Sequence, residues 1–103
     1  MKVIWQPLAK KALHDRARYI RKMHGKQVRD EFMHEAHETA RMLGRNPDAG
    51  KVEPLLENRP EGFRSFVMNR INKIVYRITD DRIEIVDFWD VRREPDTLAD
   101  SVK

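Results

Sequence analysis

The sequence predicts one α+β domain over residues 1–103, in which an N-terminal helical hairpin packs on one face of an antiparallel sheet. Apolar residues recur at helical spacing through residues 8–43. Three runs rich in Ile, Val and aromatic residues then follow one another between residues 63 and 91, with turn residues between them. The expected order of elements is therefore β-α-α-β-β-β.

The helical half begins after a short strand expected at residues 2–6, and Pro7 suits the first turn of the next helix. We expect helices over residues 8–24 and 27–43, with Gly44 ending the second one. Because their link is short, they should run antiparallel. Their apolar residues are Ala9, Ala12, Leu13, Ala17, Ile20, Met23, Val28, Phe32, Ala36, Ala40 and Leu43.

The sheet half is expected to be a three-stranded antiparallel meander over residues 63–68, 73–79 and 82–91. In the middle strand, alternation separates an apolar face from a largely cationic one: Ile74, Tyr76 and Ile78 against Lys73, Val75 and Arg77. The third strand is apolar on both faces, which predicts a central strand: Ile83, Ile85 and Trp89 against Val86 and Phe88.

The predicted core lies between the helices and the sheet. It consists of Leu13, Ile20, Phe32, Leu43, Phe66, Tyr76, Ile85 and Trp89. The connection over residues 44–62 should cross from helices to sheet, with Leu55 and Leu56 turned inward.

Charge and composition exclude several classes of protein. The chain has no cysteine, so disulfides and thiolate chemistry are excluded and a reducing cytoplasm is the expected location. No apolar run reaches membrane-spanning length, so no membrane association is expected. The net charge is +4, and residues 1–24 alone carry seven Lys or Arg against one Asp. This segregation favours an acidic or polyanionic partner.

Familiar catalytic and metal motifs do not occur. His34 and His37 are spaced i and i+3, whereas the zinc protease pattern needs i and i+4, and no third ligand is evident. Gly50 and Lys51 do not form a phosphate-binding loop, since no Ser or Thr follows. We therefore expect no metal and no cofactor.

A cationic set in and beside the meander remains: Arg64, Arg70, Lys73, Arg77, Arg92 and Arg93. Guanidinium groups bind phosphate through paired hydrogen bonds, and a cluster of them can stabilise charge during phosphodiester cleavage. Alternatively, the set pairs with acidic residues of a protein partner. A third interpretation is a set of solvated strand ends paired with Asp87, Asp90 and Glu94.

At these residues the chain resembles the RelE/ParE superfamily of type II toxin–antitoxin toxins. The segments that carry the resemblance are LGRNP at residues 43–47, GFR at 62–64, KIVYRI at 73–78 and WDVRREP at 89–95. The resemblance implies a growth-inhibiting bacterial toxin that a cognate acidic antitoxin neutralises. It also implies one of two targets, the ribosome with its mRNA for RelE-like members, or DNA gyrase for ParE-like members.

Residue matching favours the ParE-like branch. A RelE-like ribonuclease would use Arg64, Lys73, Arg77 and Arg93, but Phe66 stands where that pattern has a second basic residue on the first meander strand. The pattern also needs a reactive aromatic or His near Ala99, and no Tyr or His follows Tyr76. Without a group that transfers protons, cleavage slows by roughly 10²–10⁴-fold.

The resemblance therefore implies a non-hydrolytic gyrase poison, with Arg70, Arg92 and Arg93 as target-binding residues. A ribosome-dependent mRNA endoribonuclease and an inactive antitoxin-binding domain are the alternatives.

Overall fold

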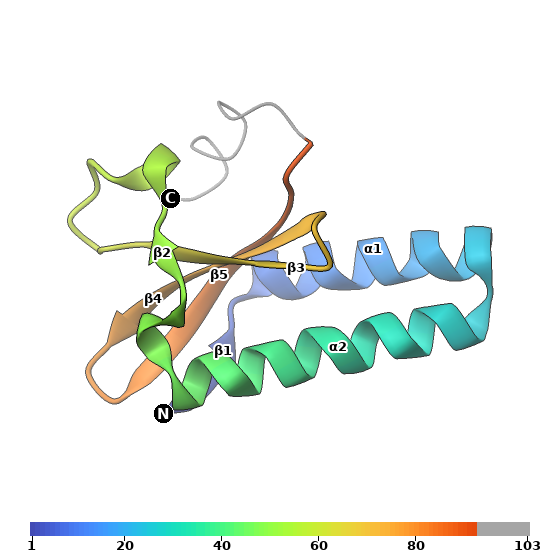
Figure 1. Cartoon of the computed structure of the whole chain (residues 1–103), viewed down its shortest axis with the longest axis horizontal. Helices are drawn as coiled ribbons and strands as arrows, with labels where there is room; N and C mark the ends of the chain where they lie inside the picture. The colour runs from blue at the N-terminus through green and yellow to red at the C-terminus, as the bar shows by residue number, and fades with distance from the viewer. Residues whose placement is uncertain (93–103) are drawn as a thin grey trace.

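The chain passes from one strand through two helices into the rest of the sheet, and the computed structural model describes residues 1–92 of it (Figure 1). The helices are α1 (Pro7–His24) and α2 (Lys26–Arg45), followed by the 3-10 turns η1 (Pro47–Ala49) and η2 (Pro54–Leu56). The strands are β1 (Lys2–Trp5), β2 (Lys51–Val52), β3 (Arg64–Met68), β4 (Asn72–Thr79) and β5 (Arg82–Asp90). The predicted class and order are confirmed, with the two-residue strand β2 as an addition.

The five strands form one sheet in the order β1-β5-β4-β3-β2. The predicted antiparallel meander is confirmed as β3, β4 and β5. However, β1 pairs in parallel with β5, so the sheet is mixed. The parallel direction places Gln6 where its amide donates to the Ile85 carbonyl at 2.9 Å, and it leads the chain directly into α1.

The helical hairpin covers one face of the sheet, but its far end projects beyond the strands (Figure 1). Gly25 joins the helices with φ +95°, a conformation that glycine adopts without steric cost. Met23 and Val28 were expected on the apolar faces of the helices, yet they are 55% and 42% exposed. They lie at the projecting end, where no layer of the sheet reaches them.

Gly44 was predicted to end the second helix, and this prediction was wrong: α2 continues to Arg45. The glycine is instead needed for close packing. A Cβ at this position would lie 2.8 Å from both the Met1 carbonyl oxygen and Val3 Cγ2, and the Met1 ammonium donates to the Gly44 carbonyl at 2.8 Å. The start of β1 is therefore fixed against the end of α2.

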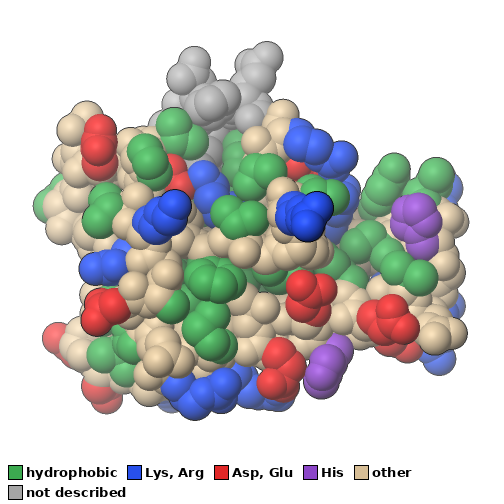
Figure 2. Space-filling view, viewed as in Figure 1, with side chains coloured by type: hydrophobic (Ala, Val, Ile, Leu, Met, Phe, Trp, Pro, Cys, Tyr) green, Lys and Arg blue, Asp and Glu red, His purple; other side chains and the backbone are tan. Residues whose placement is uncertain are grey.

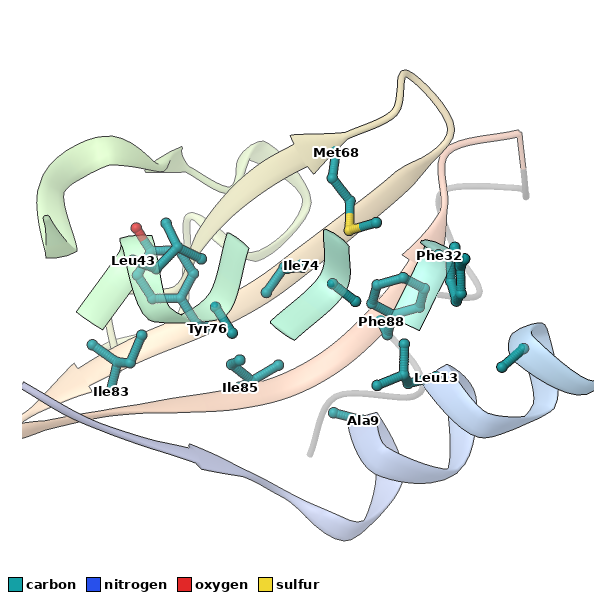
Figure 3. Close-up of a cluster of buried hydrophobic side chains, with 13 residues drawn as sticks. Ala9, Leu13, Phe32, Leu43, Met68, Ile74, Tyr76, Ile83, Ile85 and Phe88 are labelled. Atoms are coloured by element: carbon teal, nitrogen blue, oxygen red, sulfur yellow. The ribbon is translucent and has the colours of Figure 1, made fainter. Parts of the chain in front are cut away.

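The main core lies between the hairpin and the sheet (Figure 3). Its buried members include Leu13, Phe32, Leu43, Tyr76 and Ile85, all of which were predicted. Phe66 and Ile20, also predicted, pack against this cluster while only partly buried.

A β-bulge in β5 changes which residues share a face. Val75 pairs with Asp87 but Tyr76 pairs with Ile85, so Val86 is the extra residue. The bulge places Phe88 with Ile83 and Ile85 in the main core, and it turns Trp89 to the opposite face. The predicted assignment of Trp89 and Phe88 was therefore wrong, because simple alternation fails beyond a bulge.

The opposite face of the sheet carries a second, smaller core. Leu56 from the connection after α2 packs there with Phe63, Val75 and Trp89. Leu55, also expected to turn inward, is instead 38% exposed. Within residues 1–92, no helix has the length and apolar character needed to cross a membrane.

Candidate functional site

Arg64 begins β3 and lies directly opposite Tyr76 on β4. Its Nη1 donates to the Gly50 carbonyl at 2.8 Å, and its Nη2 lies 3.7 Å from an Asp48 carboxylate oxygen. The neighbouring Tyr76 hydroxyl donates to the Pro47 carbonyl at 2.6 Å and accepts from the Gly50 amide at 3.0 Å. Arg64 and Tyr76 thus hold the turn after α2 against the sheet.

Tyr76 is fully buried, and this burial raises the pKa of its hydroxyl above the ordinary value of 10.0. Both hydrogen-bonding directions of the hydroxyl are already used by backbone groups. A phenol in this position is a structural group, because it has neither access to a substrate nor a pKa near neutrality.

Lys73 on β4 forms an ion pair with Glu53, which lies in the connection that covers the second core. The Lys73 side chain is 15% exposed and the Glu53 side chain is 1% exposed. Burial alone would raise the pKa of Glu53. The Lys73 ammonium and the Leu55 amide, which donates at 2.8 Å, outweigh burial and bring the pKa below its ordinary value of 4.5.

Arg77 is also paired within the chain. Its Nε and Nη2 both lie 2.8 Å from one carboxylate oxygen of the buried Glu84. The other oxygen of Glu84 accepts from Gln6 Nε2 at 3.2 Å and lies 3.5 Å from Arg82. Arg77 thus helps to neutralise a buried carboxylate that β5 contributes to the sheet.

The structure does not bring the three described cations of the ribonuclease set together. Paired residues in an antiparallel sheet share a face, so Arg64 lies on the face of Tyr76. Lys73 and Arg77 alternate with Tyr76 along β4 and so lie on the opposite face. The remaining two positions of that pattern, Arg93 and Ala99, lie outside the described residues.

Two residues of the target-binding set do lie at one end of the sheet. Arg70 occupies the exposed turn between β3 and β4 with φ +66°. The Val91 amide donates to the Ile71 carbonyl at 2.8 Å, which brings the end of β5 beside that turn. Arg92 follows at once in the chain, while Arg93 lies outside the described residues.

Arg92 is exposed but held by Asp90. Its Nε and Nη2 lie 3.0 Å and 2.7 Å from the two Asp90 carboxylate oxygens, and its amide donates at 2.9 Å. The Arg92 guanidinium lowers the pKa of Asp90 to about 2. This pair matches the expectation that strand-end cations pair with Asp90, and it fixes where Arg92 presents its charge.

Asp90 also borders a groove of about 360 Å³ between α1 and the end of β5, which sequence reasoning did not find. The side of α1 that forms it includes Leu8, Arg16 and the half-exposed Tyr19. The Arg16 guanidinium carbon lies 5.4 Å from the centre of the Tyr19 ring. The available signal in the sequence was Tyr19, an aromatic residue that lies outside the apolar periodicity of its helix.

The Arg16 Nε is buried, and it has no hydrogen-bond partner in the part of the chain that the structure describes. The groove therefore combines apolar surface with the positive charge of the Arg16 guanidinium. In residues 1–92 no three His, Cys, Asp or Glu side chains come together to hold a metal ion.

Comparison with known proteins decides the family. Residues 3–95 match the model of the ParE toxin of the type II toxin-antitoxin system parDE. The chain belongs to the ParE toxin family. The resemblance predicted from sequence is thereby confirmed, including its ParE-like branch.

A solved structure agrees with this ParE-family fold. The chromosomal ParDE toxin–antitoxin system from P. aeruginosa contains a chain that is 18% identical in sequence and superposes with a TM-score of 0.74. The match covers 89% of this chain and 97% of the other. No curated protein matches the sequence. As a family member the chain is the toxin of a two-component module, which implies an antitoxin partner.

Proposed function

We propose that this toxin acts in the cytoplasm by poisoning DNA gyrase without a hydrolytic step of its own, and that an acidic antitoxin holds it inactive. The observation that carries the proposal is the placement of the cations. Lys73 and Arg77 are each paired with a buried carboxylate, and Arg64 lies on the other face of the sheet. A phosphodiester cannot contact all three, so ribonuclease chemistry lacks the cluster it needs.

The cations that remain presented to a target favour binding over catalysis. Arg70 forms no ion pair within residues 1–92, and Arg92 is oriented at the same end of the sheet by Asp90. Two guanidinium groups at one end of the sheet suit an acidic surface on a protein partner. Arg93, which follows Arg92 directly, is included in the proposed target-binding set.

The antitoxin fits the groove between α1 and β5. Antitoxin segments that fold on binding insert apolar side chains into such grooves. The Arg16 guanidinium, which lines the groove, supplies a positive charge for one acidic side chain. Tyr19 and Leu8 supply the apolar contacts.

The test of the target compares two assays with the purified toxin. We expect inhibition of supercoiling by gyrase, with loss of that inhibition in an Arg92→Ala/Arg93→Ala variant. Arg45→Ala/Lys51→Ala is the matched control, since both of its cations are exposed and distant from the sheet end. Cleavage of ribosome-bound mRNA by the wild type, with gyrase unaffected, would overturn the proposal and return attention to the ribonuclease set.

The test of the antitoxin site is separate. Arg16→Met should weaken antitoxin binding measured by calorimetry, because the groove loses its guanidinium charge while much of the side-chain volume stays. The control is Arg18→Met, which replaces an exposed arginine two residues further along α1. Equal affinities for the two variants would place the antitoxin elsewhere.

A further inference from the structure

The end of the helical hairpin that projects beyond the sheet is strongly basic. Residues 16–29, here called the hairpin tip, contain six Lys or Arg and no Asp or Glu. Arg21, Lys22 and Lys26 are exposed and form no ion pair with any described residue. Arg18 shares the single carboxylate of Asp15 with Lys11, at 3.3 Å and 2.7 Å. The tip therefore presents positive charge that the chain does not neutralise.

Two of these cations lie at the N-terminus of α2, where positive charge is unfavourable for a helix. The first turn of α2 contains no acidic residue, and Gly25 offers no side chain to cap it. A helix N-terminus carries partial positive charge, so Lys26 and Arg29 in the first turn are electrostatically unfavourable for an isolated helix. A bound anion would remove this conflict and would also accept hydrogen bonds from the free amides of the turn.

Cations at the end of α1 lie together on one face of the helix. Arg18 is followed at i+3 and i+4 by Arg21 and Lys22, so these three cations share one face at the end of α1. Tyr19 and Met23 are half exposed beside them. On the projecting end, Figure 2 shows apolar, acidic and His side chains facing the viewer, with Lys and Arg side chains at its edge. The acidic residues of α2 begin only at Asp30, where Arg29 binds the first of them at 2.7 Å.

We propose that the hairpin tip binds the phosphate backbone of duplex DNA. Duplex DNA presents about one negative charge per 1.7 Å of its axis, which matches cations spread around the ends of two helices. The groove between α1 and β5, where we place the antitoxin, is not lined by the exposed cations Arg21, Lys22 and Lys26. The proposal goes beyond the proposed function, because it concerns DNA alone and does not require gyrase.

The experiment measures binding of the full chain to a fluorescent 20-base-pair duplex by anisotropy, over a series of salt concentrations. The tip variant is Arg21→Gln/Lys22→Gln/Lys26→Gln. The control variant, Lys2→Gln/Lys10→Gln/Arg45→Gln, changes the net charge equally at exposed positions that make no ion pair with the described residues. Circular dichroism and thermal melting establish that both variants fold.

Each phosphate contact that is lost lowers the slope of log K against log salt by about 0.9. The tip variant should therefore lose a slope of about 2–3 and roughly tenfold or more in affinity at low salt, while the control keeps the wild-type slope. Equal losses in both variants, or no binding by the wild type at 50 mM salt, would overturn the proposal.

A labelled polyglutamate peptide separates DNA from an acidic protein partner. If the tip variant loses polyglutamate binding but binds DNA like the wild type, the partner is an acidic protein and the DNA proposal fails. A supercoiling assay on the same three proteins reports on gyrase independently. If the wild-type protein does not inhibit gyrase, the proposed function is wrong, whereas the DNA-binding result is unaffected.

Discussion

Lys73→Met is predicted to destabilise the fold by about 3 kcal/mol at neutral pH, the lower end of the range for breaking a buried ion pair. The substitution leaves the Glu53 carboxylate, whose side chain is 1% exposed, without its cation. The lower end applies because the Leu55 amide still donates to Glu53 at 2.8 Å. Urea unfolding followed by tryptophan fluorescence measures the effect, since Trp89 lies in the core that Glu53 helps to cover.

The pH dependence of this loss has a definite sign. In the wild type the pKa of Glu53 is lowered, so its contribution to stability is present above pH 4.5 and is lost as the pH falls through the folded value. In Lys73→Met the ammonium no longer opposes burial, so the pKa of Glu53 is higher than in the wild type. The deficit of the variant should therefore be greatest at neutral pH and shrink as the pH falls toward 4.5.

A second substitution provides the decisive comparison. Glu53→Gln/Lys73→Met removes both charges and keeps an acceptor for the Leu55 amide, so most of the lost stability should return. Growth inhibition in cells should return with it if Lys73 serves the fold alone. Lys51→Met, at an exposed position, should stay within about 0.5 kcal/mol of the wild type. Two results would refute the structural role of Lys73. One is a Lys73→Met variant as stable as the wild type, and the other is a double variant that is stable but still not toxic.

Three further predictions concern packing and the strand-end pair. Ile85→Ala, at a fully buried position, should lower the free energy of unfolding by about 2–5 kcal/mol in urea titrations, and a loss below about 0.5 kcal/mol would contradict the assigned faces of β5. Gly44→Ala should destabilise by about 1–3 kcal/mol, because its Cβ would lie 2.8 Å from Met1 and Val3 atoms; an unchanged melting temperature would count against this packing. Arg92→Ala should raise the pKa of Asp90 from about 2 toward 3.8, measured by NMR titration of the carboxyl group. In the wild type, Asp90 contributes stability above pH 3.8 that is lost as the pH falls through about 2, and this contribution should be absent in the variant. An unchanged pKa of Asp90 in the variant would refute the Asp90–Arg92 pair.

Hydrophobic patterning was sufficient to predict the fold because the signals for this class are local. Alternation along β4 and helical spacing through Leu13 and Phe32 depend on near neighbours in the chain, and both were confirmed. The errors arose where one residue changes the pattern. The bulge at Val86 moved Trp89 to the other face. The only polar residue there is Asp87, whose carboxylate accepts from the Phe88 amide at 2.8 Å, and an acidic residue within an apolar run does not by itself specify a bulge.

The candidate site was harder to predict, because its geometry depends on contacts between distant residues. Lys73 looked like a free cation on a sheet face, but Glu53 reaches it from a connection that has no regular periodicity. The groove beside β5 likewise combines Arg16 of α1 with Asp90, two residues separated by most of the described chain. Nothing in the local sequence of either residue indicates the other.

These pairings divide the basic residues of the sheet into two functional kinds. Arg64, Lys73 and Arg77 hold connections or buried carboxylates in place, so replacing them disturbs the fold before it can report on a target. Arg70 and Arg92 stand at one end of the sheet, and the cations of the hairpin tip stand at the projecting end of the helices. A toxin that acts by chemistry would need its cations gathered on one scissile bond. A toxin that acts by holding a large assembly benefits from separated cations on rigid elements, because each can contact a different part of the target.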